Sequence, residues 1–173
     1  MDVRQYPDPV LRAKTAEVTQ FDQALADLAK QMITTMHAAN GLGLAAPQVG
    51  VSRRIAIVAG DGEPGHETVL VNPQIVESEG WEEAEEGCLS FPGIYIKMGR
   101  FARVFVRYHD LKGGVCEMGA RGLAARAVQH EVDHLDGRLL VDRMSTVQRM
   151  AHRRRLRELE GRYRRPDQSL SAR

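Results

Sequence analysis

The sequence has few of the features that mark secreted, membrane or fibrous proteins. It contains two cysteines in 173 residues, too few for a disulfide framework in a chain of this size. No apolar run approaches the roughly 18 residues that a membrane-spanning helix requires. Acidic residues are scattered through the first twenty positions, which fits neither a secretory signal nor a transit peptide. We therefore expect a cytoplasmic protein with no membrane partner.

The composition that remains is that of an ordinary globular protein with an uneven distribution of charge. Hydrophobic residues make up 43% and charged residues 27% of the chain, and the formal net charge is +1. Residues 143–165 hold nine Arg against two Glu, a local charge of +7, which leaves 1 − 7 = −6 for the rest. Such asymmetry favours an anionic partner for the C-terminal segment.

The pentapeptide HEVDH, from His130 to His134, is the most specific short pattern in the chain. Two histidines four residues apart share one face of a helix and can bind one zinc or iron ion, while Glu131 lies beside the metal as a base. A chance match in a chain of this composition has an expected count on the order of 0.02. Residues 119–135 lack proline and are followed by Gly137, so the motif is predicted to lie on a helix.

Periodicity and turn residues predict the other elements. They are a first helix from its cap at Asp22 to Asn40 and Gly41, strands over Arg54–Val58 and Thr68–Val71, a hairpin of Phe101–Tyr108 and the strand around Cys116, and a third helical stretch from Ser145 through Arg165. The apolar positions of that last stretch are sparse, and they include Val147, Met150 and Leu156. We therefore expect it to be loosely attached or to dock on a partner.

A catalytic zinc or iron site usually has three protein ligands and one open position, so a third ligand is required. Leu140 occupies the position of the third histidine in the HExxHxxGxxH pattern, which excludes that class. Glu158 and Glu160 lie among arginines, a poor setting for a metal ligand. Cys88 lies in the glycine-flanked turn EGCLSFPG and is the better choice, whereas Cys116 is predicted to be a small buried side chain.

Three motifs together, GLGLAAPQ at 41–48, EGCLS at 86–90 and QHEVDHL at 129–135, resemble the peptide deformylase family. The similarity extends to YPDPVLR near the N-terminus and to VNPQI at 71–75, and it covers most of residues 3–144. The resemblance implies a catalytic domain over residues 1–144. The Arg-rich segment outside it is predicted to be a basic helical tail over residues 145–173. The resemblance also implies an α+β fold in which antiparallel sheets wrap a central helix bearing HEVDH, with a helix near the N-terminus.

The activity that the resemblance implies is hydrolysis of the N-formyl group from the initiator methionine of new polypeptides, with release of formate. The implied metal is Fe(II), for which zinc, nickel or cobalt can substitute. The implied roles are metal ligation by Cys88, His130 and His134, acid and base catalysis by Glu131, oxyanion stabilisation by Gln48 and the Leu89 amide, and substrate binding by backbone groups of Leu42, Gly43 and Gly87.

Two other functions are also considered. The first is a zinc endopeptidase that uses the same HEVDH helix. The second is a non-catalytic ribosome- or RNA-binding protein whose metal site is only structural, and the Arg-rich tail is the reason to consider it. An enzyme of nascent chains could also bind the ribosome through this tail, so tail binding and catalysis are compatible. The sequence leaves open the metal bound in the cell, the side chains preferred after methionine, and the oligomeric state.

Overall fold

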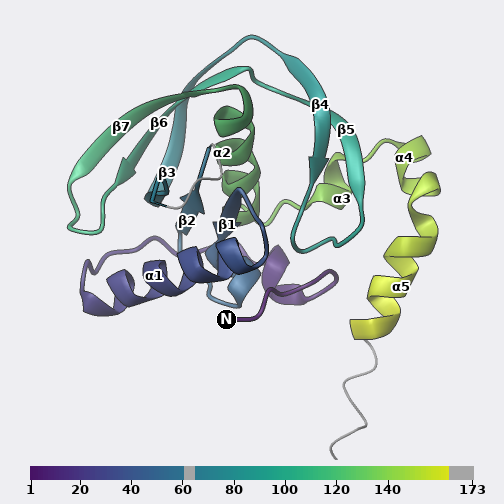
Figure 1. Cartoon of the computed structure of the whole chain (residues 1–173), viewed down its shortest axis with the longest axis horizontal. Helices are drawn as coiled ribbons and strands as arrows, with labels where there is room; N and C mark the ends of the chain where they lie inside the picture. Colours follow the sequence, from purple (N-terminus) through teal and green to yellow (C-terminus); the bar gives the residue numbers. More distant parts are fainter. Residues whose placement is uncertain (61–64, 164–173) are drawn as a thin grey trace, which may run out of the picture.

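Antiparallel strands wrap round a central helix in the computed structural model, which describes residues 1–60 and 65–163 (Figure 1). The helices are η1 (Pro9–Arg12), α1 (Gln23–Ala38), η2 (Ala46–Val49), α2 (Gly122–Leu135), α3 (Leu140–Arg143), α4 (Thr146–Ala151) and α5 (Arg153–Tyr163), of which η1 and η2 are short 3-10 helices. The strands are β1 (Gly43–Ala45), β2 (Ile55–Val58), β3 (Thr68–Glu79), β4 (Glu82–Gly87), β5 (Tyr95–Arg100), β6 (Arg103–His109) and β7 (Val115–Arg121). The expected fold class is confirmed.

The strands form two sheets. The larger has the order β1-β2-β3-β6-β7, and each neighbouring pair is antiparallel. The smaller is the antiparallel pair β4–β5. In the described part of the chain, β1 and β4 each pair on one side only. The predicted hairpin is present as β6–β7, with Gly113 at a positive φ in its turn.

Helix α2 lies inside the curve of the strands (Figure 1). Its small residues Ala125, Ala127 and Val128 are buried and belong to one apolar cluster with residues of β2, β3, β6 and β7. Small side chains allow the strand backbones to approach the helix closely, because little volume separates the two layers. The helix that carries HEVDH is therefore held by several strands.

Helix α1 packs against β1 and β2 and leads directly into the glycine-rich segment. The Asp22 side chain accepts a hydrogen bond from the Leu25 amide at 3.0 Å, which caps the helix as predicted. Leu25, Met32 and Met36 are fully buried, at helical spacing. Asn40 has a φ of +53°, a left-handed conformation that ends the helix and turns the chain into β1.

The C-terminal segment differs from its prediction in two ways. The helical stretch is interrupted at His152, so that α4 and α5 are separate helices. It is also attached to the body, because Leu156 and Leu159 of α5 are buried in a cluster with Leu11 and Phe91. Two leucines three residues apart are enough for a short helix that packs on one side only. Residues 164–173, the end of the predicted stretch, lie outside the described residues.

The acidic segment 77–86 divides between the end of β3 and β4, and its residues differ in exposure. Glu82, Glu83 and Glu85 are exposed, whereas Glu86 is buried. Cys116 in β7 is half-buried rather than fully buried. Over residues 1–60 and 65–163, the structure contains no helix of the length and apolarity needed to cross a membrane.

Candidate metal centre

One thiol and two imidazoles converge at the C-terminal end of β4. The Sγ atom of Cys88 lies 3.2 Å from Nε2 of His134, and this nitrogen lies 3.2 Å from Nε2 of His130. The ligand atoms of the three residues all lie within 4.8 Å of one another. The structure therefore brings Cys88 next to two histidines that lie 42 and 46 positions further along the chain.

Local structure explains how Cys88 reaches the helix. β4 ends at Gly87, and a hydrogen bond from the Phe91 amide to the Cys88 carbonyl at 2.9 Å closes the following turn. The N-terminal arm holds this turn from outside, because the Tyr6 amide donates to the Ser90 carbonyl at 2.9 Å. The two histidines share one face of α2, so the sulfur and both rings meet.

Glu86 sets the tautomer of His130. Its Oε1 lies 2.7 Å from His130 Nδ1, so the ionised Glu86 accepts a hydrogen bond from Nδ1–H. The lone pair of a neutral His130 then lies on Nε2, which faces the cluster. Burial opposes the charge on Glu86, but hydrogen bonds from His130 and Arg100 hold its pKa well below the ordinary value. A carboxylate behind an imidazole is a common support for a metal-binding histidine.

The electrostatics of the two rings differ. Burial lowers the pKa of His134 well below its usual range, and the neighbouring His130 adds to this effect, so this ring is neutral and its lone pair is free for a metal. Burial also opposes a charge on His130, but the Cys88 sulfur and Glu86 outweigh it and raise the pKa of that ring. The negative charge of Cys88 and Glu86 that favours a proton on His130 would also favour a metal cation at the cluster.

Glu131 lies beside the cluster and against the backbone of β1. Its side chain is buried, and burial raises its pKa to about 7. A Cβ atom built on Gly43 would lie only 2.3 Å from Glu131 Oε1, so the carboxylate occupies the space that a larger residue at 43 would fill. Its Oε2 is buried and has no hydrogen-bond partner among the described residues.

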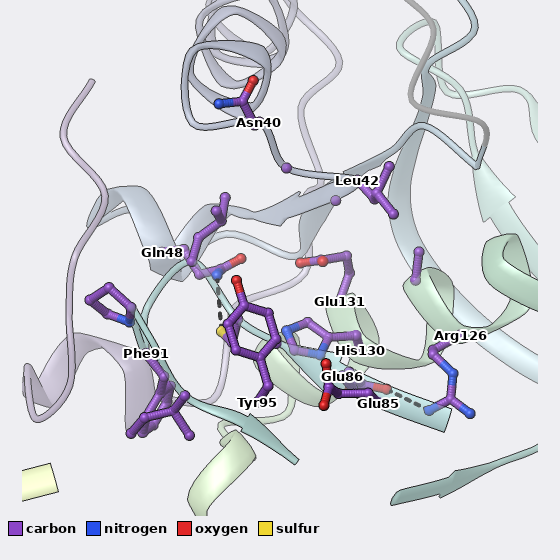
Figure 2. A pocket seen from close by; sticks show the side chains of 18 of the residues that line it. Asn40, Leu42, Gln48, Glu85, Glu86, Phe91, Tyr95, Arg126, His130 and Glu131 are labelled. Carbon is purple, nitrogen blue, oxygen red and sulfur yellow. Dashed lines mark hydrogen bonds and ion pairs between the residues drawn. The ribbon is translucent and has the colours of Figure 1, made fainter. Parts of the chain in front are cut away.

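Gln48 approaches the cluster from η2, with its amide held in one orientation. The Ala45 amide donates to Gln48 Oε1 at 2.9 Å, so Nε2 faces Ser90 Oγ at 3.2 Å and Cys88 Sγ at 3.7 Å. Gln48 is only 1% exposed. Figure 2 shows its amide nitrogen directed at the sulfur, with Glu131 and His130 on the other side of the pocket.

A cavity of about 460 Å³ opens beside these residues. The remaining predicted residues Leu42, Gly43, Gly87 and Leu89 all line it, as do Cys88, His130, Glu131 and Gln48. His134 is absent from this lining and lies behind, 1% exposed. The cavity also involves Tyr95, Leu123 and Arg126, so apolar and polar surfaces surround the centre, as in many small-ligand sites.

Three residues that support the site were missed from the sequence. Ser90 holds the Gln48 amide, while Arg100 and Asp133 form ion pairs behind His130. Ile96, Met98 and Arg100 alternate along β5 and all three are buried. An arginine at the third position of this otherwise apolar pattern was the one sign in the sequence that Arg100 is buried. Asp133 and Ser90 carry no comparable pattern.

The residues present fit a divalent metal. A thiol and two imidazoles are a donor set used for zinc and iron, and three such ligands leave a position for water. The oriented lone pair of His130, the neutral His134 and the unpartnered oxygen of Glu131 each agree with that assignment.

Known proteins with similar sequences belong to one family. The sequence profile of the polypeptide deformylase family matches residues 1–150. The peptide deformylase of Thermodesulfovibrio yellowstonii is 45% identical over 90% of this chain and 95% of its own length. The peptide deformylase of Thermotoga neapolitana is 44% identical over 91% of this chain and 94% of its own length.

Solved structures give the same result. Peptide deformylase 1B of Arabidopsis thaliana, in complex with an inhibitor, superposes with a TM-score of 0.90 at 40% identity, over 94% of this chain and 92% of that one. The peptide deformylase of Plasmodium falciparum superposes with a TM-score of 0.89 at 36% identity, over 99% of this chain and 100% of that one. The chain belongs to the polypeptide deformylase family.

Proposed function

We propose that Cys88, His130 and His134 bind the metal with which this chain removes the formyl group from N-formyl-methionyl peptides. Deformylation of new polypeptides is the reaction of the family to which the chain belongs, and membership of that family removes the zinc endopeptidase alternative. The observation that carries the residue assignment is the Cys-His-His cluster opening onto a cavity beside the buried Glu131. We propose the cytoplasm as the site of action, where new chains are made.

The chemistry follows from the positions of the side chains. A divalent metal, when bound, supplies a Lewis acid that polarises the formyl carbonyl and acidifies the attacking water. Glu131 accepts the proton that this water loses as its oxygen bonds to the formyl carbon. The same carboxyl then protonates the amine nitrogen as the C–N bond breaks, so formate and a free amino terminus are released.

Gln48 and the Leu89 amide stabilise the negative charge that develops on the formyl oxygen. The Ala45 amide and Ser90 Oγ fix the Gln48 amide, so its N–H is held in place before the charge appears. Loss of one preorganised donor of this kind typically lowers the rate by about 10²- to 10³-fold.

The substrate peptide binds as an added strand through backbone groups of Leu42, Gly43 and Gly87. β1 is the terminal strand of the larger sheet, and β4 has a described partner only in β5. The chain just before and within β1 and the end of β4 line the same cavity. Unpaired strand edges at a cavity are a common means of binding an extended peptide.

The metal assigned to the cluster is Fe(II), with zinc, nickel or cobalt able to occupy it. A thiolate ligand favours such metals over magnesium or calcium. Metal analysis of protein purified without oxygen tests this assignment. Iron close to one per chain is expected, and zinc alone under these conditions would contradict it.

Formate release from a formyl-Met peptide tests the proposed roles. Cys88→Ala is expected to lose both the metal and turnover, whereas Glu131→Gln should keep the metal and lose turnover. Cys116→Ala is the matched control, because this half-buried cysteine lies outside the cluster. A Cys88→Ala protein with the metal content of wild type would remove Cys88 from the ligand set, and turnover by Glu131→Gln would remove Glu131 from the mechanism.

We further propose that the Arg-rich tail contacts ribosomal RNA. Arg153, Arg154 and Arg157 are exposed on α5, whereas its buried side carries Leu156 and Leu159. Cations on one side and apolar residues on the other allow the helix to pack on the body and still present positive charge. This arrangement suits a phosphate backbone.

Neutralisation tests the tail better than deletion, because deletion would uncover the cluster around Leu11 and Phe91. Replacing the three arginines by glutamine should weaken ribosome cosedimentation at low salt. The slope of log affinity against log salt should fall by about 0.7 to 0.9 for each phosphate that the variant no longer neutralises. The same change at exposed Arg53, Lys112 and Arg121 is the control, and equal effects of the two triple variants would contradict the proposal.

A further inference from the structure

Arg100 is a buried cation that the deformylation chemistry does not use directly. It lies at the end of β5 on the strand's inward face and is 5% exposed. A buried guanidinium is costly unless its donors are paired. All of its nitrogens are in fact used, and all of them go to two carboxylates.

The two carboxylates come from different elements. Arg100 donates to Glu86 of β4 from Nη2 at 2.7 Å and from Nε at 3.2 Å. It donates from Nη1 to Asp133 of α2 at 2.6 Å. The two-point contact with Glu86 fixes the plane of that carboxylate, since a guanidinium is a rigid fork. The contact with Asp133 joins the same fork to the helix that bears both histidines.

The carboxylate that Arg100 fixes is the one that orients His130. Glu86 Oε1 accepts from Arg100 Nη2 and also from His130 Nδ1, at 2.7 Å in each case. One oxygen therefore joins the guanidinium to the imidazole whose other nitrogen faces Cys88 and His134. Figure 2 shows Glu86 beneath the His130 ring.

Arg126 also contacts Glu86, but in a different way. Its Nη1 reaches only Oε2, at 3.0 Å, and its remaining bonds go to the carbonyls of Met98 and Glu82. Arg126 therefore compensates the charge of Glu86 and ties it to the strands, without contacting the oxygen on His130 or the helix carboxylate.

We propose that Arg100 is a positioning residue for the metal centre, holding Glu86 against His130 and fixing α2 through Asp133. This inference rests on the proposed function, because it takes Cys88, His130 and His134 as metal ligands. Arg143, at the end of α3, donates to the same Asp133 at 2.6 and 3.2 Å, so the ion-pair network extends from the metal ligand to the start of the C-terminal helices.

Cobalt binding by the full-length chain tests the proposal. Apo protein of the wild type, Arg100→Met and Arg100→Lys is titrated with Co(II), and affinity and the visible absorption spectrum are recorded. Arg54→Met is the matched control, because Arg54 is a partly buried arginine paired with Asp136 at the end of the same helix, away from His130. Guanidine denaturation and circular dichroism establish that each variant is folded.

Arg100→Met should bind Co(II) about 10- to 100-fold more weakly than wild type, the usual effect of removing support from a metal ligand. Its visible spectrum should change, since His130 is free to tilt. Arg100→Lys keeps the charge but not the planar fork, so its affinity should lie between the two. Arg54→Met should match wild type in both affinity and spectrum.

Two results would overturn the proposal. One is wild-type affinity and spectrum in Arg100→Met, or in Arg100→Lys if the methionine variant does not fold. The other is an equal loss in Arg54→Met, which would show a general effect of removing an ion pair from α2. If the wild type itself binds no cobalt at the cluster, the proposed function fails instead, so the two failures are distinguishable.

Discussion

The contact between Glu131 and the backbone of β1 makes position 43 intolerant of any side chain. A methyl group there would lie 2.3 Å from Glu131 Oε1 and would displace the carboxylate. A displacement of about 1 Å at a reacting group can lower a rate about 10²-fold. We therefore expect Gly43→Ala to reduce formate release by about that factor while the metal stays bound, because the three atoms nearest to this methyl group all belong to Glu131 and to none of the proposed ligands.

Gly161→Ala provides the control for this prediction. Gly161 lies in α5, and a Cβ atom there meets nothing within 4 Å. Alanine should stabilise the helix by up to about 1 kcal/mol and leave turnover unchanged. Wild-type turnover in Gly43→Ala, measured at saturating substrate, would show that Glu131 does not need its observed position.

At the residue scale, the sequence predicted groups that carry a motif and missed groups that act through a neighbour. His130, Glu131 and His134 could be found because helix periodicity fixes their relative positions. Cys88 could be chosen by excluding the alternatives. Arg100 could not, because its role depends on two carboxylates brought together only when β4 and β5 pair beside α2.

The C-terminal helices show where prediction fails at the scale of elements. The sparse apolar positions predicted loose attachment, yet two leucines, Leu156 and Leu159, are enough to pack α5 against the rest of the protein. Leu156 and Leu159 are 7% and 1% exposed, while Val147 and Met150 are 76% and 70% exposed. Periodicity alone gave no way to tell these pairs apart, because the interruption at His152 separates α4 from α5.

This difference leads to a prediction for stability. Leu159→Ala should lower the free energy of unfolding by about 2 to 5 kcal/mol, because it leaves a cavity among Leu11, Phe91 and their neighbours. Met150→Ala should change it by less than about 0.5 kcal/mol, since that side chain is exposed. Urea unfolding with equal losses in both variants would mean that α5 is not packed on the body in solution.

The strands show a second limit of prediction at this scale. The sequence predicts a short strand over Thr68–Val71, but β3 continues to Glu79 through Pro73 and the acidic residues that follow. Proline and glutamate are both unfavourable in strands. Pairing with β6 holds this extension in place, with register shifts around residues 71–77. Such a long-range partner is invisible to a local reading of the sequence.

For the whole molecule, the metal would act as a cross-link between parts that fold from distant sequence. Cys88 lies in the turn after β4, whereas His130 and His134 lie on α2, so an ion bound by all three would tie the smaller sheet to the central helix. A ligand that binds only the folded state stabilises it by about 2.7 kcal/mol at a concentration of 100 times Kd. For a chain of this size, each kcal/mol corresponds to roughly 2–4 °C in Tm.

We therefore expect saturating metal to raise the Tm of the apo protein by roughly 5–10 °C, as measured by circular dichroism on heating. Cys88→Ala should lose most of this rise, because two imidazoles alone bind far more weakly than the complete set. Cys116→Ala should keep it in full, since that thiol lies outside the cluster. A full rise in Cys88→Ala would show that the metal stabilises the fold through other residues, and the thiol would then have no part in joining the sheet to the helix.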